Sequence, residues 1–237
     1  MFGRLIYLCD VANVALTFAS YARVYRRQLR EVGALAAQED VRHYCRKILL
    51  SAGQTMCVEG ELPSLDTGHY VIVSTHASYL DVFTIGALLT GKFTAAAAQE
   101  YMRWFVIGPI LCAHNCIAID RSDGKAARES LLRLGAEAIA QGFSVVGFPE
   151  GTRTRDGYLQ PLKTGLFQLA SNTSKKIVSI HIQNAFEAAN RRDWRVQPGE
   201  LVVRISPHLI DPKDLTVAEI AEHVREEFIW LGAKERP

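Results

Sequence analysis

Hydrophobic residues recur along the chain with two different periods. Between residues 54 and 210 they form short runs rich in Val, Ile and Thr, which is typical of buried strands. Most stretches between these runs carry apolar residues every three or four positions, as amphipathic helices do. Strands that alternate with helices predict an α/β domain, in which helices cover a sheet. The predicted strands are 55–60, 70–75, 116–120, 144–148, 176–182 and 201–206, and the predicted helices are 79–89, 125–141, 162–172 and 217–232.

The first 53 residues carry a different pattern and are predicted to form a separate helical segment. Residues 1–30 contain no proline and have glycine only at position 3, and their polar side chains share one narrow helical face. This helix ends in four arginines that cluster on one side: Arg23, Arg26, Arg27 and Arg30. A second helix is predicted over 36–53, with apolar positions at Val41, Tyr44, Ile48 and Leu49.

An apolar helix with a basic end is typical of a segment that lies at a membrane interface, where arginine meets anionic lipid. Packing of this helix on the protein's own core is the alternative. A cleaved signal peptide fits less well, because Asp10 interrupts the apolar stretch and only Arg4 precedes it as a charge. We therefore expect residues 1–53 to form a monotopic membrane-interface segment and residues 54–237 to form the α/β domain.

Composition narrows the classes of function. With 49% hydrophobic and 22% charged residues, the 237-residue chain is globular rather than disordered. A net charge of +2 argues against nucleic acid as a partner, because binders of nucleic acid are usually more basic. No run of 18 uncharged apolar residues occurs, so an ordinary transmembrane helix is not indicated. Five scattered cysteines without a CxxC pair favour reduced thiols.

Several common catalytic motifs do not occur in the sequence. There is no GxGxxG fingerprint, no P-loop, no HExxH zinc motif and no GxSxG nucleophile elbow. Cys112 and Cys116 have no nearby partners at zinc-ligand spacing either. We therefore expect neither a metal nor a resident cofactor, and the candidate chemistry has to come from other polar residues.

A histidine and an aspartate follow the predicted strand 70–75 closely. His76 and Asp81 are five positions apart, so they do not share a face of a regular helix. They can meet only if His76 lies in the turn after the strand and Asp81 lies in the first turn of the next helix. A neutral histidine oriented by a carboxylate is a general base that can activate a substrate hydroxyl. A pair that merely caps the helix is the alternative.

Two further motifs follow predicted strands. The run Glu150–Gly151–Thr152–Arg153 comes after strand 144–148, where Glu150 can accept from a hydroxyl and Arg153 can bind a phosphate. Gly151 permits an unusual φ or the close approach of a ligand. Strand 116–120 ends in Asp120 and Arg121, and Arg121 is a candidate anion contact. Structural salt bridges are the alternative at both places.

These residues together resemble a known family. HASYLD, CIAIDR, FPEGTR and IVSIHI occur in the order and approximate spacing of the glycerolipid acyltransferases, and most resemble the bacterial lysophosphatidic acid acyltransferases. The resemblance covers about residues 40–210. It implies a mixed sheet flanked by helices, like that of glycerol-3-phosphate acyltransferase, with an N-terminal amphipathic helical anchor.

The resemblance also implies roles for single residues. His76 would be the general base and Asp81 its partner, and the acceptor would be bound by Arg121, Glu150, Gly151, Thr152 and Arg153. The acyl donor would be acyl-CoA or acyl carrier protein, and the acceptor a membrane lysolipid, with 1-acylglycerol-3-phosphate favoured. The implied place of action is the cytoplasmic face of a membrane with an anionic surface, such as the bacterial inner membrane.

The sequence departs from the family pattern at four places. Thr75 stands where Asn is usual, Asn115 where Gly is usual, and Ser179 where Pro is usual. Ala98 and Gln99 stand where a Lys is usual, which removes one cation from the expected phosphate site; Arg103 is a possible replacement. Two alternatives therefore stay open: an acyltransferase for another acceptor, such as a lyso-aminolipid, and a non-catalytic membrane-binding scaffold.

Overall fold

The computed structural model describes residues 38–66, 69–103, 111, 116–192 and 195–236. The expected interfacial helix at 1–30 lies outside these ranges. Within them, no helix combines the length and the apolar character that crossing a membrane requires.

In the described part of the chain, seven strands form one mixed sheet with the order β1-β7-β6-β2-β5-β3-β4. Neighbouring strands are parallel except for β6 and β7, which are antiparallel. The mixed α/β sheet that the resemblance implied is therefore confirmed. The strands are β1 (Gln54–Glu59), β2 (Val71–Ser74), β3 (Phe93–Ala98), β4 (Ile117–Ile119), β5 (Ser144–Gly147), β6 (Ile177–Gln183) and β7 (Gly199–Ile205).

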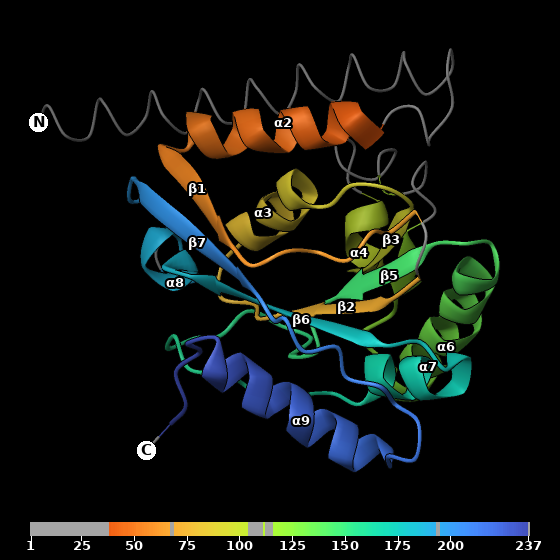
Figure 1. The fold of residues 1–237 in the computed structure, drawn as a ribbon. Helices are drawn as coiled ribbons and strands as arrows, with labels where there is room; N and C mark the ends of the chain where they lie inside the picture. Colours follow the sequence, from red (N-terminus) through yellow and green to blue (C-terminus); the bar gives the residue numbers. More distant parts are fainter. Residues whose placement is uncertain (1–37, 67–68, 104–110, 112–115, 193–194, 237) are drawn as a thin grey trace, which may run out of the picture.

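Helices cover both faces of this sheet (Figure 1). One face carries α2 (Gln38–Ser51) and α3 (Leu80–Leu88), and the other carries α6 (Gly124–Ala140), α7 (Gly165–Thr173) and α9 (Val217–Trp230). Two short helices, α4 (Gln99–Met102) and α8 (Ala185–Ala188), lie in connections.

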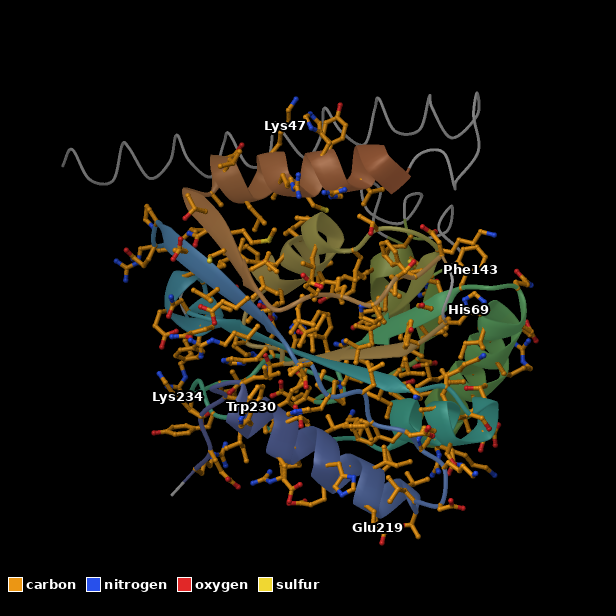
Figure 2. The ribbon with its side chains drawn as sticks, viewed as in Figure 1. Lys47, His69, Phe143, Glu219, Trp230 and Lys234 are labelled. Atoms are coloured by element: carbon orange, nitrogen blue, oxygen red, sulfur yellow. The ribbon has the colours of Figure 1, made fainter. Side chains whose placement is uncertain are left out.

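The core has two layers because side chains alternate across each strand. In β2, Ile72 packs with the α2–α3 layer, whereas Val71 and Val73 pack with the α6–α7–α9 layer. Side chains fill the space on both sides of the sheet, and Trp230 projects at the end of α9 (Figure 2). Because β2 is buried on both faces, its sequence reads as a continuous apolar run.

Six strands and five helices occur close to where the pattern predicts them. The hydrophobic pattern does not predict β3, because its sequence FTAAAA is rich in alanine, which has a low strand propensity. Pairing with β5 and β4 on its two sides makes this segment a strand nevertheless. The helix predicted from 162 begins only at Gly165, because the Lys163 N–H is bound by the carbonyl of Pro149.

The topology brings three loops to one edge of the sheet. β2 lies between β5 and β6 and is parallel to both. The carboxyl ends of these strands therefore meet at the same edge, which is where open α/β sheets bind ligands. His76 follows β2 at this edge, and the FPEGTR segment follows β5.

Candidate active site

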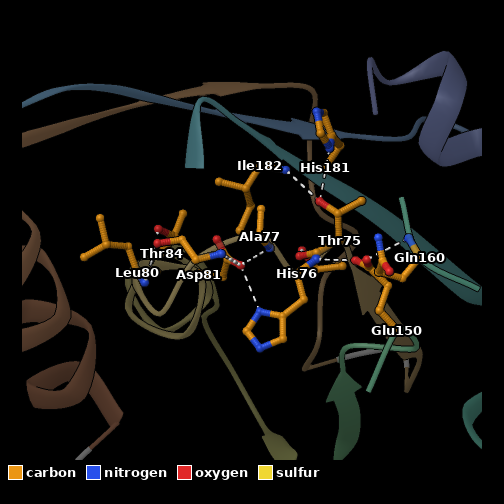
Figure 3. Close-up of polar contacts among 12 residues, drawn as sticks. Thr75, His76, Ala77, Leu80, Asp81, Thr84, Glu150, Gln160, His181 and Ile182 are labelled. Atoms are coloured by element: carbon orange, nitrogen blue, oxygen red, sulfur yellow. Dashed lines mark hydrogen bonds and ion pairs between the residues drawn. The ribbon is translucent and has the colours of Figure 1, made fainter. Parts of the chain in front are cut away.

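The turn between β2 and α3 is organised around the carboxylate of Asp81. Its Oδ2 accepts hydrogen bonds from the backbone N–H groups of Ala77 (2.7 Å) and Ser78 (2.8 Å), and it lies 2.9 Å from Nδ1 of His76 (Figure 3). Asp81 stands in the first turn of α3, and His76 stands in the preceding turn. This confirms the geometry predicted from the five-residue spacing.

The imidazole of His76 is held in one orientation. With Nδ1 donating to the Asp81 carboxylate, Nε2 is left as the basic nitrogen of the neutral ring. The ring of Phe148 stacks on the imidazole, with centroids 4.0 Å apart and planes inclined by 15°. The side chain of His76 is 12% exposed and that of Asp81 is 1% exposed. Asp81 is thus a buried carboxylate that orients the ring, and His76 is a base that reaches the surface.

The backbone of His76 is bound on both sides by the loop after β5. Its N–H donates to Oε1 of Glu150 (2.6 Å), and its carbonyl accepts from the N–H of Thr154 (2.9 Å). The other oxygen of Glu150, Oε2, accepts from the N–H of Gln160 (3.0 Å). Glu150 therefore links the loop after β2 to the loop after β5. The sequence pattern did not reveal this role.

Glu150 is buried, and burial shifts the pKa of its carboxyl group. Burial raises the pKa of its carboxyl to about 7. The two backbone N–H donors act in the opposite direction and lower the pKa, while the nearby charge of Asp81 raises it further.

Thr75 extends the pairing of β2 with β6 beyond the end of the strand. Its N–H donates to the carbonyl of Ile180 (3.1 Å), and its hydroxyl oxygen accepts from the N–H of Ile182 (3.3 Å). The hydroxyl also lies 3.1 Å from Nδ1 of His181, as Figure 3 shows. Burial, and next the charge of Arg204, lower the pKa of His181 to about 4, so its ring is neutral at pH 7. The residue before the candidate base is therefore fixed by three polar contacts.

The structure places the remaining predicted residues on two different loops. Gly151, Thr152 and Arg153 follow Glu150 directly, and Gly151 has a φ of +70°. Arg121 lies after β4, which β3 separates from β5.

Asp120 and Arg121 after β4 are neighbours in the sequence, but each contacts a different residue. Nη1 of Arg121 is 3.7 Å from Oε1 of Glu100. Asp120 instead accepts from the backbone N–H and the hydroxyl of Ser122, so no ion pair between Asp120 and Arg121 forms. The structure thus brings His76, Asp81 and Glu150 together but leaves Arg121 two strands from β5.

Comparison with known proteins places this geometry in a family. A family model described as Acyltransferase matches residues 35–183. The chain belongs to the acyltransferase family.

Curated relatives agree with this assignment. The chain is 31% identical over 155 residues to the 1-acyl-sn-glycerol-3-phosphate acyltransferase of Limnanthes douglasii, an alignment that covers 65% of this chain and 55% of that protein. It is 29% identical over 167 residues to human 1-acyl-sn-glycerol-3-phosphate acyltransferase alpha, covering 68% and 58%. The chain thus spans about half the length of the curated relatives it matches.

The fold has a solved counterpart. The crystal structure of the 1-acyl-sn-glycerophosphate (LPA) acyltransferase PlsC from Thermotoga maritima matches with a TM-score of 0.80 at 19% identity. The match covers 94% of this chain and 92% of that one. At this identity, the comparison shows that the fold is shared.

The candidate site also contains residues to which the sequence analysis gave no role. Phe148 stacks on the base, Gln160 binds Glu150, and His181 contacts Thr75. Lys163 extends over Gly151, since a Cβ built on Gly151 would lie 2.9 Å from Lys163 Nζ. Phe148 and His181 stand inside the motifs FPEGTR and IVSIHI, but no sequence spacing shows which residues they contact in the fold.

Replacing Glu150 will change how stability depends on pH. The folded carboxyl has a pKa of about 7 and the unfolded one about 4.5, so the folded state keeps a proton that the unfolded state releases. Stability should therefore fall as pH rises from about 4.5 to about 7, by about 3 kcal/mol at most. In Glu150→Gln this contribution disappears. Urea unfolding at pH 5 and pH 8 measures it, with the exposed Glu129→Gln as control. An unchanged pH slope in Glu150→Gln would contradict the assignment.

Removing the hydroxyl of Thr75 will weaken the link between β2 and β6. Thr75→Val keeps the shape of the side chain but leaves the Ile182 N–H and the His181 ring without their partner. An orphaned buried donor costs about 1–3 kcal/mol, which we expect as a loss of unfolding free energy. Thr75→Ser, which retains the hydroxyl, should lose clearly less. Equal stability of the Val and Ser variants would show that the hydroxyl contacts contribute nothing.

Proposed function

We propose that this protein transfers a fatty acyl group from acyl-CoA or acyl carrier protein to the free hydroxyl of a lysolipid. The favoured acceptor is 1-acylglycerol-3-phosphate, which would give phosphatidic acid. The observation that carries the proposal is the His76–Asp81 pair, with Nε2 of His76 unbonded to any described group, at the carboxyl edge of an acyltransferase-family sheet. The names of the relatives support the choice of acceptor.

The geometry supports a general-base mechanism. Nε2 of His76 takes the proton of the acceptor hydroxyl while its oxygen attacks the thioester carbonyl. The tetrahedral intermediate then collapses, the C–S bond breaks, and the imidazolium returns the proton to the leaving thiolate. Asp81 fixes the tautomer and stabilises the imidazolium. The thioester is already activated toward an alcohol, so the proposed reaction needs no metal and no resident cofactor.

General-base assistance accounts for part of the rate. It is typically worth ~10²–10⁴-fold, and the rest comes from holding the two substrates together and from stabilising the oxyanion. The clamping of the His76 backbone by Glu150 and Thr154 serves the first of these, since it fixes where the base stands.

A different acceptor is the second candidate, and a specific observation favours it. Ala98 and Gln99 stand where the family pattern has a lysine, so one cation expected near the acceptor's phosphate is missing. A lyso-aminolipid would need fewer cations. A non-catalytic scaffold would release no thiol with any acceptor.

Loss of the base will abolish most turnover. We expect His76→Ala to lower kcat by ~10²–10⁴-fold and Asp81→Asn to lower it less, because the base itself remains. The measurement is thiol release from acyl-CoA with lysophosphatidate, monoacylglycerol and a lyso-aminolipid as acceptors. His208→Ala is a matched control, because Nδ1 of His208 lies 3.0 Å from Glu227 in a similar pair outside the site. A folded His76→Ala enzyme with near-normal kcat would refute the mechanism.

We further propose monotopic attachment to the cytoplasmic face of a membrane, where both acyl donors occur. The support is the sequence of residues 1–30, with an apolar helical surface and four terminal arginines.

Changing Arg23, Arg26, Arg27 and Arg30 to Gln in the full chain should weaken binding to anionic vesicles. Basic residues near such a surface are worth about 1 kcal/mol each, so the loss should reach up to about 10³-fold at low salt and shrink as salt rises. Co-sedimentation with phosphatidylglycerol vesicles measures it. The control variant changes four exposed cations of the described part to Gln: Lys125, Arg128, Arg133 and Lys213. Equal losses in both variants would point to net charge rather than to this segment.

A further inference from the structure

The loop between β5 and α7 holds the backbone of the candidate base, and the loop itself needs support. It runs from residue 148 to residue 164 without a regular helix or strand. Connections longer than about 12–15 residues are uncommon in compact domains and are often functional. Glu150 accepts from the N–H of His76 (2.6 Å), and the N–H of Thr154 donates to the carbonyl of His76 (2.9 Å). The position of His76 therefore depends on what keeps this loop in place.

Inside the loop, the carboxylate of Asp156 gathers the polar groups around Thr154. Its Oδ1 accepts from the hydroxyl of Thr154 (2.9 Å) and from the N–H of Tyr158 (3.3 Å). The side-chain amide of Gln160 donates to the same hydroxyl (3.1 Å), while the backbone N–H of Gln160 donates to Oε2 of Glu150 (3.0 Å). Asp156 and Gln160 thus join the two residues that bind the base in one hydrogen-bonded network.

The other oxygen of Asp156 is bound from outside the loop. Nη2 of Arg236 donates to Oδ2 of Asp156 (2.9 Å). Next to this pair, the N–H of Leu159 donates to the carbonyl of Lys234 (2.8 Å), as part of a parallel backbone bridge. Residues 233–236, which follow α9, therefore lie along the loop and are attached to it both by backbone and by side chain.

The end of α9 directs this segment toward the loop. Gly232 has a φ of +110°, and its N–H donates to the carbonyl of Ile229 (2.9 Å). The next N–H, of Ala233, donates to the carbonyl of Phe228 (2.8 Å). This is the Schellman pattern, in which a glycine ends a helix and turns the chain. A Cβ on Gly232 would also lie only 2.7 Å from Nη1 of Arg204. The course of the segment after α9 is therefore set by a turn that requires glycine.

Three consecutive residues of the segment 233–236 form ion pairs. The pairs are Lys234–Glu187 (3.0 Å), Glu235–Arg225 and Arg236–Asp156 (2.9 Å). The first two connect the segment to α8 and α9, and the third reaches the loop after β5. A single exposed ion pair contributes little, but several pairs on one short segment hold it in place together.

We propose that Arg236 and Asp156 are positioning residues of the candidate active site. Arg236 binds Asp156, Asp156 binds Thr154, and Thr154 binds the carbonyl of the base. Both residues act through others and not on a substrate. The inference rests on the proposed acyl transfer, because it assigns them a part in placing His76 for that reaction. A misplacement of about 1 Å can cost about 10²-fold in rate, so a pair far from the chemistry can change kcat.

Charge reversal tests the assignment by kinetics. Arg236→Glu sets two carboxylates opposite each other, and we expect kcat for acyl transfer from acyl-CoA to lysophosphatidate to fall about tenfold. KM for both substrates should stay within twofold, because only the placement of the base changes. In an Asp156→Asn background the same reversal should lower kcat less than twofold, since the repulsion is gone. Arg236→Lys should retain most of the activity.

The matched control reverses the charge of an ion pair outside this segment. Arg133 lies 3.0 Å from Glu137 on α6, and both side chains are exposed. Arg133→Glu changes the net charge of the chain as much as Arg236→Glu does, and it should leave kcat unchanged. The control thereby separates the Arg236–Asp156 contact from a general effect of charge on the enzyme or on its membrane.

Amide hydrogen exchange supplies a readout that does not depend on turnover. In the full chain, Arg236→Glu should speed exchange in the peptides that contain the N–H groups of His76 and Thr154, while β6 keeps its protection. Arg133→Glu should change neither. If the wild type acylates no lysolipid and Arg236→Glu still speeds exchange at both places, the proposed function fails while the placement of His76 by this segment stands.

Three results would overturn the assignment. The first is a kcat of Arg236→Glu within twofold of the wild type, or unchanged exchange at His76, which would leave the segment with a role in stability alone. The second is a higher KM with unchanged kcat, which would assign the segment to substrate binding. The third is an equal fall in kcat in the Asp156→Asn background, which would exclude Asp156 as the link. Arg236 is exposed, and Arg236→Gln, with an expected fall of about two- to fivefold, keeps the test decisive if the reversal does not fold.

Discussion

The candidate site depends on one buried carboxylate oxygen. Oδ2 of Asp81 receives the N–H groups of Ala77 and Ser78 and the Nδ1 of His76. A carboxylate that is removed from water must be bonded in this way, or its burial costs several kcal/mol. The same three bonds close the turn after β2, start α3 and orient the base. Local folding and the readiness of the base for catalysis therefore have the same physical cause.

A second layer fixes the turn itself, and the topology of the sheet makes it possible. β2 and β5 are neighbours although some 70 residues separate them in the sequence, since α3, β3, β4 and α6 lie between. Their parallel pairing sets the two following loops side by side, so that Glu150 can reach the backbone of His76. On the other side of β2, the Thr75 hydroxyl bonds β6. The base is therefore held by both neighbouring strands.

The local parts of this site could be predicted from the sequence, and the non-local parts could not. The spacing of His76 and Asp81 allowed only one way for them to meet, and the structure has it. The apolar runs identified six strands, but β3 was hidden because alanine does not favour a strand without its neighbours. The bond of Glu150 to the His76 N–H and the separation of Arg121 from β5 both follow from strand order. Strand order is set by tertiary packing, which no short motif encodes.

One short loop segment holds the backbone of the base from two sides. Glu150 accepts from the N–H of His76, and the N–H of Thr154 donates to its carbonyl. A displacement of this loop therefore acts on His76 directly, through two hydrogen bonds to its backbone. The proposed acyl transfer needs the base in one position while the hydroxyl attacks. The two bonds supply that constraint from a loop that lies far from His76 in the sequence.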